Sequence, residues 1–159
     1  MSEPRLVEWD EILLRLRGSM LEAMVQREVA SRRVPIQEIH LTFVPGELRI
    51  DGKVEKFFLI PFRLFIRRIE SSGGAIRIYL ENISAFGLPI PVLLRKFAEK
   101  AMQNDALAFD AVNNVITVRL DRFLPTFLDV DVRHIEIIEG GIGVALGQGG
   151  ADIPPGGTK

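Results

Sequence analysis

The stretch over residues 57–66, FFLIPFRLFI, constrains this 159-residue chain more than any other. A strand with one face in water alternates apolar and polar residues, but here both faces are largely apolar. One face would hold Phe58, Ile60, Phe62, Leu64 and Ile66, and the other Phe57, Leu59 and Phe65, with only Pro61 and Arg63 interrupting. We expect a long strand with one face in the core. Its other face must meet a second element, a partner, a lipid or a membrane.

Composition bounds the remaining choices. A chain of 159 residues fits one domain with a sizeable core, and a net charge of −1 gives no overall attraction to nucleic acid. The absence of cysteine excludes disulfides, thiolate metal sites and a cysteine nucleophile. The start, MSEPRLVEWDEILL, does not resemble a secretory signal, and no stretch approaches the roughly 18 apolar residues that span a bilayer. We therefore expect a cytoplasmic protein that could contact a membrane from its surface.

Two helices are predicted. Over residues 5–31, Trp9, Leu13, Leu16, Met20 and Met24 recur at spacings of three and four, which is one face of a helical period. Pro4 and Pro35 flank this segment. A second, shorter helix is predicted over residues 91–104, where Pro91 suits the first turn and Phe97 belongs to the apolar stripe.

Antiparallel strands are predicted for most of the rest. The pairs Pro45-Gly46, Asp51-Gly52 and Asn113-Asn114 indicate turns, of which Asp51-Gly52 has the sequence of a tight hairpin. Alternation slips near Arg133-His134, which indicates either a bulge or a change of packing environment. We expect one α+β domain over residues 1–146, with a long N-terminal helix packed on a curved, mostly antiparallel sheet. Residues 147–159, rich in Gly and Pro, are predicted to be a disordered tail.

No catalytic or metal motif competes with these apolar patterns. His40 and His134 lie in predicted strands and the pattern G-x-S-x-G is absent. Asp129 and Asp131 share a strand face, but the loop of oxygen ligands that a calcium or magnesium site needs is missing. The glycines after residue 139 do not fit a phosphate-binding pattern, and no helix follows them. We therefore expect no enzyme, no metal and no cofactor.

The segments IRIYL at 76–80, ISAFGLPIP at 83–91 and the hairpin over 135–146 resemble the tubular lipid-binding (TULIP-like) domains, in particular their bacterial LmeA-like branch. The resemblance covers roughly residues 36–146 and consists of hydrophobic patterns. It implies a non-enzymatic protein that holds phospholipid or another long apolar ligand in a groove between helix and sheet.

The sequence thus leaves two functions open. The first is binding of a lipid or apolar small molecule, without nucleic acid. The expected lipid-binding residues are Phe58, Ile60, Phe62, Leu64, Ile76, Ile78, Leu80 and Phe97, with Arg63 and Arg67 as headgroup ligands. These arginines lie in a segment, residues 34–103, that carries 10 Lys or Arg and 7 Asp or Glu. The second is a structural or interaction module whose apolar sheet face forms a homo-oligomer or a partner interface.

Overall fold

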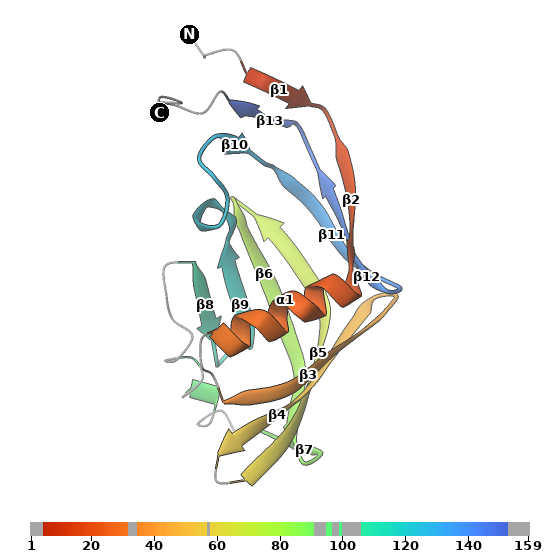
Figure 1. Ribbon diagram of the computed structural model, residues 1–159, viewed down its shortest axis with the longest axis vertical. Helices are drawn as coiled ribbons and strands as arrows, with labels where there is room; N and C mark the ends of the chain where they lie inside the picture. The colour runs from red at the N-terminus through yellow and green to blue at the C-terminus, as the bar shows by residue number, and fades with distance from the viewer. Residues whose placement is uncertain are drawn as a thin grey trace.

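The computed structural model describes residues 5–31, 35–56, 58–90, 95, 96, 99 and 106–152. Antiparallel strands dominate this part of the chain (Figure 1). The α-helix α1 has 14 residues. The elements before residue 90 are β1 (Arg5–Trp9), β2 (Ile12–Arg17), α1 (Gly18–Ser31), β3 (Ile36–Val44), β4 (Glu47–Lys56), β5 (Phe58–Ser72), β6 (Ala75–Ala85) and β7 (Leu88–Pro89). After residue 105 come β8 (Leu107–Asp110), β9 (Val115–Arg119), the 3-10 helix η1 (Leu120–Arg122), β10 (Leu128–Asp129), β11 (Val132–Ile138), β12 (Gly141–Leu146) and β13 (Gly149–Asp152).

The main sheet has the strand order β3-β4-β5-β6-β9-β8, with the short β7 beside β6. Short turns join β3 to β4, β5 to β6 and β8 to β9, and the predicted turns at Pro45-Gly46 and Asn113-Asn114 are confirmed. Strand β5 is 15 residues long and pairs with β4 on one side and β6 on the other. The long apolar segment therefore lies in a central strand of the sheet rather than in an edge strand.

The remaining strands form one three-stranded sheet with a bend, which we call the bent sheet. Each of its three strands is interrupted once: β1 and β2 at residues 10–11, β10 and β11 at 130–131, β12 and β13 at 147–148. Strand order is β1-β13-β10 on one side of the bend and β2-β12-β11 on the other. Beyond the bend the strands pack closely, because a Cβ built on Gly149 would lie 2.3 Å from the carbonyl oxygen of Asp129 and 2.8 Å from Nε1 of Trp9.

The two sheets meet where β11 runs beside the upper half of β5, beyond the end of β4. The hydroxyl of Ser71 donates to the carbonyl of Val132 at 2.6 Å, and the N–H of Gly46, in the β3–β4 turn, donates to the carbonyl of Ile137 at 2.9 Å. The N–H of Gly18 also donates to the carbonyl of Gly140 at 2.7 Å, which fixes the start of α1. One curved surface therefore continues from the main sheet into the bent sheet.

The core lies where α1, β3 and the middle of the main sheet meet. Its buried side chains are Phe43, Leu48, Ile66, Leu80, Phe109, Ala111 and Ile137, and Leu21 of α1 packs against them. Helix α1 also lies along the free edge of β3. Glu22 accepts a hydrogen bond from the N–H of Leu41, and the side-chain amide of Gln26 donates to the carbonyl of Ile39, both at 2.8 Å. Side chains of the helix thus satisfy backbone groups that an edge strand leaves unpaired.

The predicted α+β class with a long N-terminal helix is wrong, because the described chain is mostly β and α1 begins only at Gly18. Residues 5–17 form β1 and β2 instead. The spacing of Trp9, Leu13 and Leu16 fits a helix, but Ile12, Leu14 and Leu16 also alternate as in a strand, and pairing with β12 decides for the strand. Of the helix predicted over 91–104, the structure describes residues 95, 96 and 99, which are helical.

Two further expectations are corrected. Asp51-Gly52 is not a hairpin but the middle of β4, where Gly52 lies opposite Phe62 and the Phe62 ring occupies the space that a Gly52 side chain would need. The predicted tail begins too early, because Gly149–Asp152 forms β13 between β1 and β10. Residues 153–159 lie outside the described part. The slip predicted near Arg133-His134 is confirmed as a register shift between Val132 and His134.

Candidate functional site

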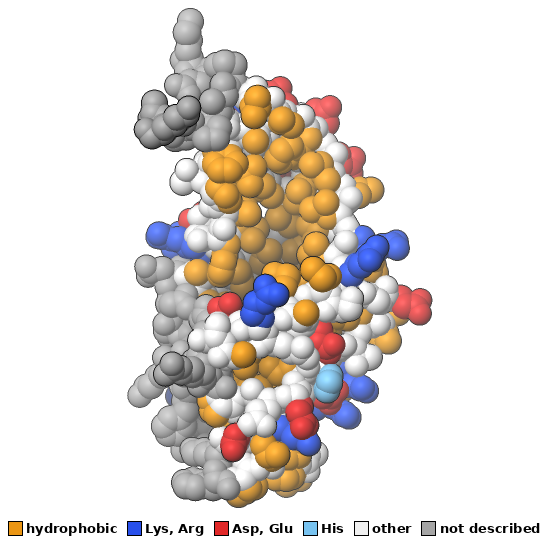
Figure 2. Space-filling view, viewed as in Figure 1, with side chains coloured by type: hydrophobic (Ala, Val, Ile, Leu, Met, Phe, Trp, Pro, Cys, Tyr) orange, Lys and Arg blue, Asp and Glu red, His pale blue; other side chains and the backbone are white. Residues whose placement is uncertain are grey.

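A concave apolar surface extends across the bent sheet and the adjoining part of the main sheet. We call it the trough. Its lining is aliphatic and comes from five strands: Leu14 and Leu16 of β2, Ile142 and Val144 of β12, Ile135 and Ile137 of β11, Ile69 of β5, and Ile78 of β6. Figure 2 shows hydrophobic side chains gathered in this hollow, above α1.

The strand register places these side chains on one face. Leu16, Ile142 and Ile137 lie in one row across β2, β12 and β11. The next row on the same face consists of Leu14, Val144 and Ile135. Because side chains alternate along a strand, the polar neighbours Arg15 and Glu136 point to the opposite face. The trough is therefore built by period-2 patterns in β2 and in the β11–β12 hairpin, which are far apart in the sequence.

The lining of the trough stays accessible to solvent. Leu14 is 43% exposed and Leu16 is 39% exposed, and Ile135, Ile142 and Val144 are half-buried. By contrast Ile137 is buried, because it reaches into the core beside Phe43 and Leu48. The floor of the trough thus joins the core, while its upper part remains an apolar surface without a covering element among the described residues.

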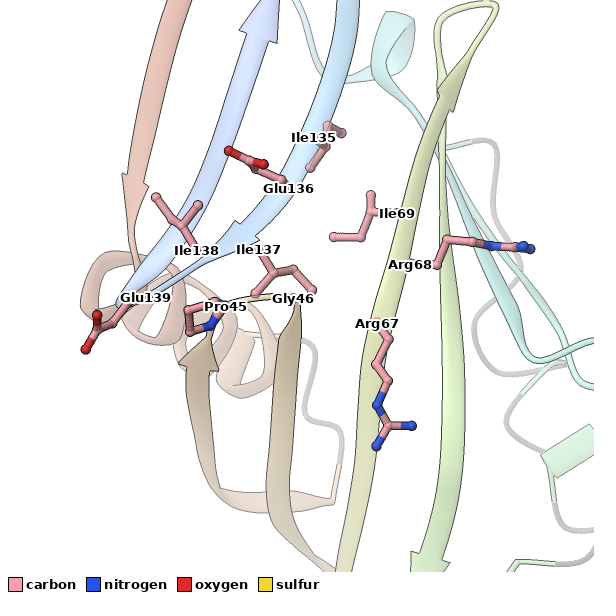
Figure 3. Close-up of a pocket in the computed structure, with 10 residues that line it drawn as sticks. All are labelled: Pro45, Gly46, Arg67, Arg68, Ile69, Ile135, Glu136, Ile137, Ile138 and Glu139. Carbon is pink, nitrogen blue, oxygen red and sulfur yellow. The ribbon is translucent and has the colours of Figure 1, made fainter.

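A hollow of about 450 Å³ marks the junction of β11 and β5 (Figure 3). Ile69, Ile135 and Ile137 point into the space between the two strands, and Arg67, Arg68, Glu136 and Glu139 belong to its rim. The hollow opens to solvent, so an apolar chain bound along the trough would find additional apolar surface there.

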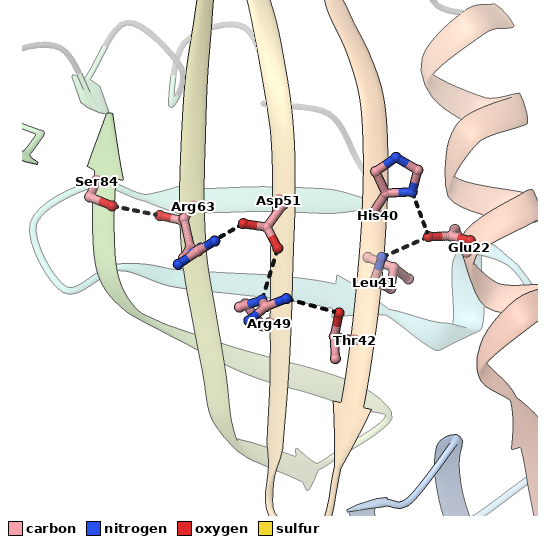
Figure 4. Close-up of polar contacts among 8 residues, drawn as sticks. All are labelled: Glu22, His40, Leu41, Thr42, Arg49, Asp51, Arg63 and Ser84. Carbon is pink, nitrogen blue, oxygen red and sulfur yellow. Dashed lines mark hydrogen bonds and ion pairs between the residues drawn. The ribbon is translucent and has the colours of Figure 1, made fainter. Parts of the chain in front are cut away.

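The outer face of the main sheet is polar and its charges are paired (Figure 4). Asp51 accepts hydrogen bonds from Nε of Arg49 at 2.9 Å and from Nε of Arg63 at 2.6 Å. Arg67 donates to Glu47 at 2.9 Å and to Glu81 at 2.6 Å. Partial burial alone would raise the pKa of Asp51, but the hydrogen bonds and charges of Arg63 and Arg49 outweigh it and hold the pKa below its ordinary value.

The structure separates the predicted lipid-binding residues into two groups. Ile60, Phe62 and Leu64 lie on the inner face of the lower half of β5, and Phe58 is 60% exposed beside the ring of Phe86. Ile76, Ile78 and Leu80 instead pair with the upper half of β5, opposite Ser71, Ile69 and Ile66. Leu80 is buried in the core, and Phe97 lies outside the described residues.

The predicted headgroup ligands lie away from the trough. Arg63 and Arg67 are on the outer face of β5 and are paired with Asp51, Glu47 and Glu81. The inner face at the same level carries Leu64 and Ile66. A ligand whose tail lies on the inner face would therefore not reach either guanidinium across the sheet.

Sequence reasoning missed the main part of the trough, on β2, β11 and β12. The signal was present as alternation: Ile12, Leu14 and Leu16 in one segment, and Ile142, Val144 and Leu146 in another. The first segment also fits a helical spacing, which hides its period of two. The second fits a closing hairpin, a pattern that does not by itself indicate a site.

Two histidine–carboxylate pairs lie outside the trough. Nδ1 of His40 lies 3.4 Å from Glu22, and Nε2 of His134 lies 3.7 Å from Glu136, which is itself on the rim of the hollow beside β5. Within the described residues, no group of three or more His, Cys, Asp and Glu could hold a metal ion. The described helices include none long and apolar enough to cross a membrane.

Comparison with protein-family models, with curated proteins and with solved structures gives no match.

Proposed function

We propose that this protein binds phospholipid or another long apolar molecule, non-enzymatically, along the trough. The observation that carries the proposal is the uncovered aliphatic face of the bent sheet, with Leu14 at 43% and Leu16 at 39% exposure. Isolated exposed hydrophobic residues are ordinary on proteins, but a contiguous concave patch of them marks an interaction site. The shape and chemistry of the trough suit an extended hydrocarbon chain better than a compact polar ligand.

The lining of the trough supports this class of ligand. Leu14, Ile135 and Val144 offer aliphatic contacts without a polar group that would select a particular functional group. Each methylene transferred from water to such a surface contributes about 0.8 kcal/mol, so a chain of ten or more methylenes gives ample binding free energy even when only part of it is buried. Affinity would then increase with chain length rather than depend on the headgroup.

The resemblance to tubular lipid-binding domains favours the same ligand class, although the groove differs from the one that the resemblance implied. The trough is formed between strands of two sheets, not between a long helix and a sheet. The ligand would be taken up from, or delivered to, a membrane surface, and the open side of the trough would admit it laterally.

The test begins with the protein as purified. An organic extract of the folded protein should contain an acyl lipid in near-stoichiometric amount by mass spectrometry, or the delipidated protein should bind a fluorescent fatty-acyl probe. An empty extract together with no binding of the probe would overturn the proposal. The apolar face would then be assigned to the second function, an interface with a protein partner.

A further inference from the structure

The outer edge of β2 is the free edge of the bent sheet at the rim of the trough. Strand β2 pairs with β12 on one side only, and no other described strand pairs with it. Proteins commonly protect such edges with proline, lysine, bulges or a covering helix. Strand β2 has no proline, lysine, bulge or covering helix among the described residues, and its charged residues are Arg15 and Arg17, whereas the edge of β3 is covered by Glu22 and Gln26 of α1.

The backbone of β2 shows which groups this edge offers. The N–H of Gly18 donates to the carbonyl of Gly140, which is the pair that continues the β2–β12 register. In an antiparallel ladder the hydrogen-bonding direction alternates, so Leu16, Leu14 and Ile12 also direct their backbone groups toward β12. The N–H and C=O groups of Leu13, Arg15 and Arg17 therefore point outward from the free edge.

The side chains of β2 are unpaired as well. Leu13 is 76% exposed on the face opposite the trough. Arg15 and Arg17 of β2, and Glu11 immediately before it, form no ion pair with another residue in the described ranges, in contrast to Arg49, Arg63 and Arg67 on the main sheet. The β2 edge and the residue that precedes it thus carry exposed backbone groups, an exposed leucine and unpaired charges of both signs.

We propose that β2 pairs edge to edge with β2 of a second copy of this chain, antiparallel, with Leu14 on the two-fold axis. In this register Ile12 faces Leu16 of the second copy, so the apolar faces of the two troughs become one continuous surface. On the opposite face Leu13 lies against Arg15, and Glu11 lies against Arg17 of the second copy. The self-complementary charges and the outward backbone groups select a second copy as the occupant.

Neighbouring registers are less favourable. Sliding one β2 strand along the other by two residues keeps the apolar side chains of both strands on the trough face. Sliding it by one residue would place them opposite the polar side chains of the other face. Centring the pair on Arg15 places Arg15 opposite Arg15, which brings like charges together. Centring it on Leu13 places Leu16 opposite Asp10 on the apolar face. The register centred on Leu14 avoids both conflicts and pairs the outward groups of Leu13 with those of Arg15.

Pairing through β2 does not depend on a ligand in the trough, because it involves the edge of the sheet rather than its concave face. It would nevertheless extend the trough. The bent sheets of two copies would form a single six-stranded sheet, and a bound apolar molecule could extend across the junction from one copy to the other.

Cysteine substitution tests the register directly, because the chain contains no native cysteine. Directly opposed residues in a non-hydrogen-bonded antiparallel pair have Cα atoms about 4.5 Å apart, which a disulfide can bridge. With an added oxidant such as diamide, Leu14→Cys should form a covalent dimer on non-reducing gels. Leu16→Cys is the matched control, because two such residues would lie about 13 Å apart along the pair. Equal cross-linking of both variants, or none with Leu14→Cys, would overturn the proposal.

Charge exchange provides the second measurement, in sedimentation equilibrium of the unmodified chain and its variants. Glu11→Lys or Arg17→Glu alone should raise the dimer dissociation constant about tenfold, because each opposes like charges twice per dimer. The double variant should restore the affinity of the original chain. A monomer at all protein concentrations, or a dimer indifferent to all three variants, would contradict pairing through β2. Circular dichroism confirms that each variant is folded.

Discussion

The main sheet and the bent sheet are built from the same kind of strand, but only the main sheet is completed by its own chain. At the centre of the main sheet, Ile66 is 5% exposed and α1 covers the edge of β3. On its outer face, Asp51 and Arg67 have ionic partners. In the bent sheet, Leu14 and Leu16 remain accessible, and Arg15 and Arg17 form no ion pair within the residues that the structure describes. We therefore expect stability to depend mainly on the main sheet, and the proposed binding function on the bent sheet.

Truncation of one isoleucine in each sheet should give the greatest difference in the free energy of unfolding. Ile66→Ala removes a buried side chain between Leu48 and Leu80 and should lower the free energy of unfolding by about 2–5 kcal/mol. Ile135→Ala removes a half-buried side chain from the trough and should cost about 1 kcal/mol or less, because little packing is lost there. Urea unfolding of both variants measures the contrast. Similar losses in the two would show that the trough is as much a part of the core as Ile66.

A smaller effect is expected at Gly52. A Cβ at this position would lie 2.6 Å from the Phe62 ring, which packs over the glycine across β4 and β5. Gly52→Ala should therefore destabilise the main sheet by about 1–3 kcal/mol through overpacking. Gly46→Ala is a control for backbone strain, because a Cβ there has no neighbouring atom within 4 Å and only the φ of +79° is unfavourable. If the double variant of Gly52→Ala with Phe62→Leu is no more stable than Gly52→Ala, the ring is not the cause.

These two residues also show what the sequence could and could not predict. The pair Asp51-Gly52 has the sequence of a hairpin, yet Gly52 is there to accommodate the Phe62 ring, a need that only the strand register reveals. The long strand around Phe62, the turn at Pro45-Gly46 and the slip near His134 follow from local patterns and are confirmed.

In the bent sheet the β11–β12 hairpin follows from local patterns, but the pairing of β1 and β2 does not. Arg5 of β1 pairs with Asp152 of β13, and Leu14 of β2 pairs with Val144 of β12. Partners so far apart in the sequence leave no local trace, and the spacing of residues 5–17 also fits a helix. Most of the trough depends on those pairings, which is why the predicted site contained Ile78 but not Leu14, Ile135 or Val144.

The smallest stability effect concerns the ion pairs of the main sheet. The pKa of Asp51 is held below its ordinary value of 3.8, so its carboxylate stabilises the folded state above that pH. This contribution should decrease as the pH falls through the lowered pKa. Asp51→Asn should therefore cost about 1 kcal/mol or less at pH 7, and the difference from the original chain should shrink as the pH falls below 3.8. A difference in melting temperature that is independent of pH would show that the charge of Asp51 is not responsible.

Two neighbouring residues on β12, the central strand of the bent sheet, test whether the trough binds the ligand. Val144 lines the trough, whereas Ala145 points to the opposite face, beside Leu13 and His134. Titration of the delipidated protein with a fluorescent fatty-acyl probe should give saturable binding that Val144→Asp weakens at least tenfold and that Ala145→Asp leaves within about twofold, since only the first places a charge against the hydrocarbon chain. Equal binding by both variants, or no binding by the unmodified chain, would contradict the assignment of the trough as the ligand site.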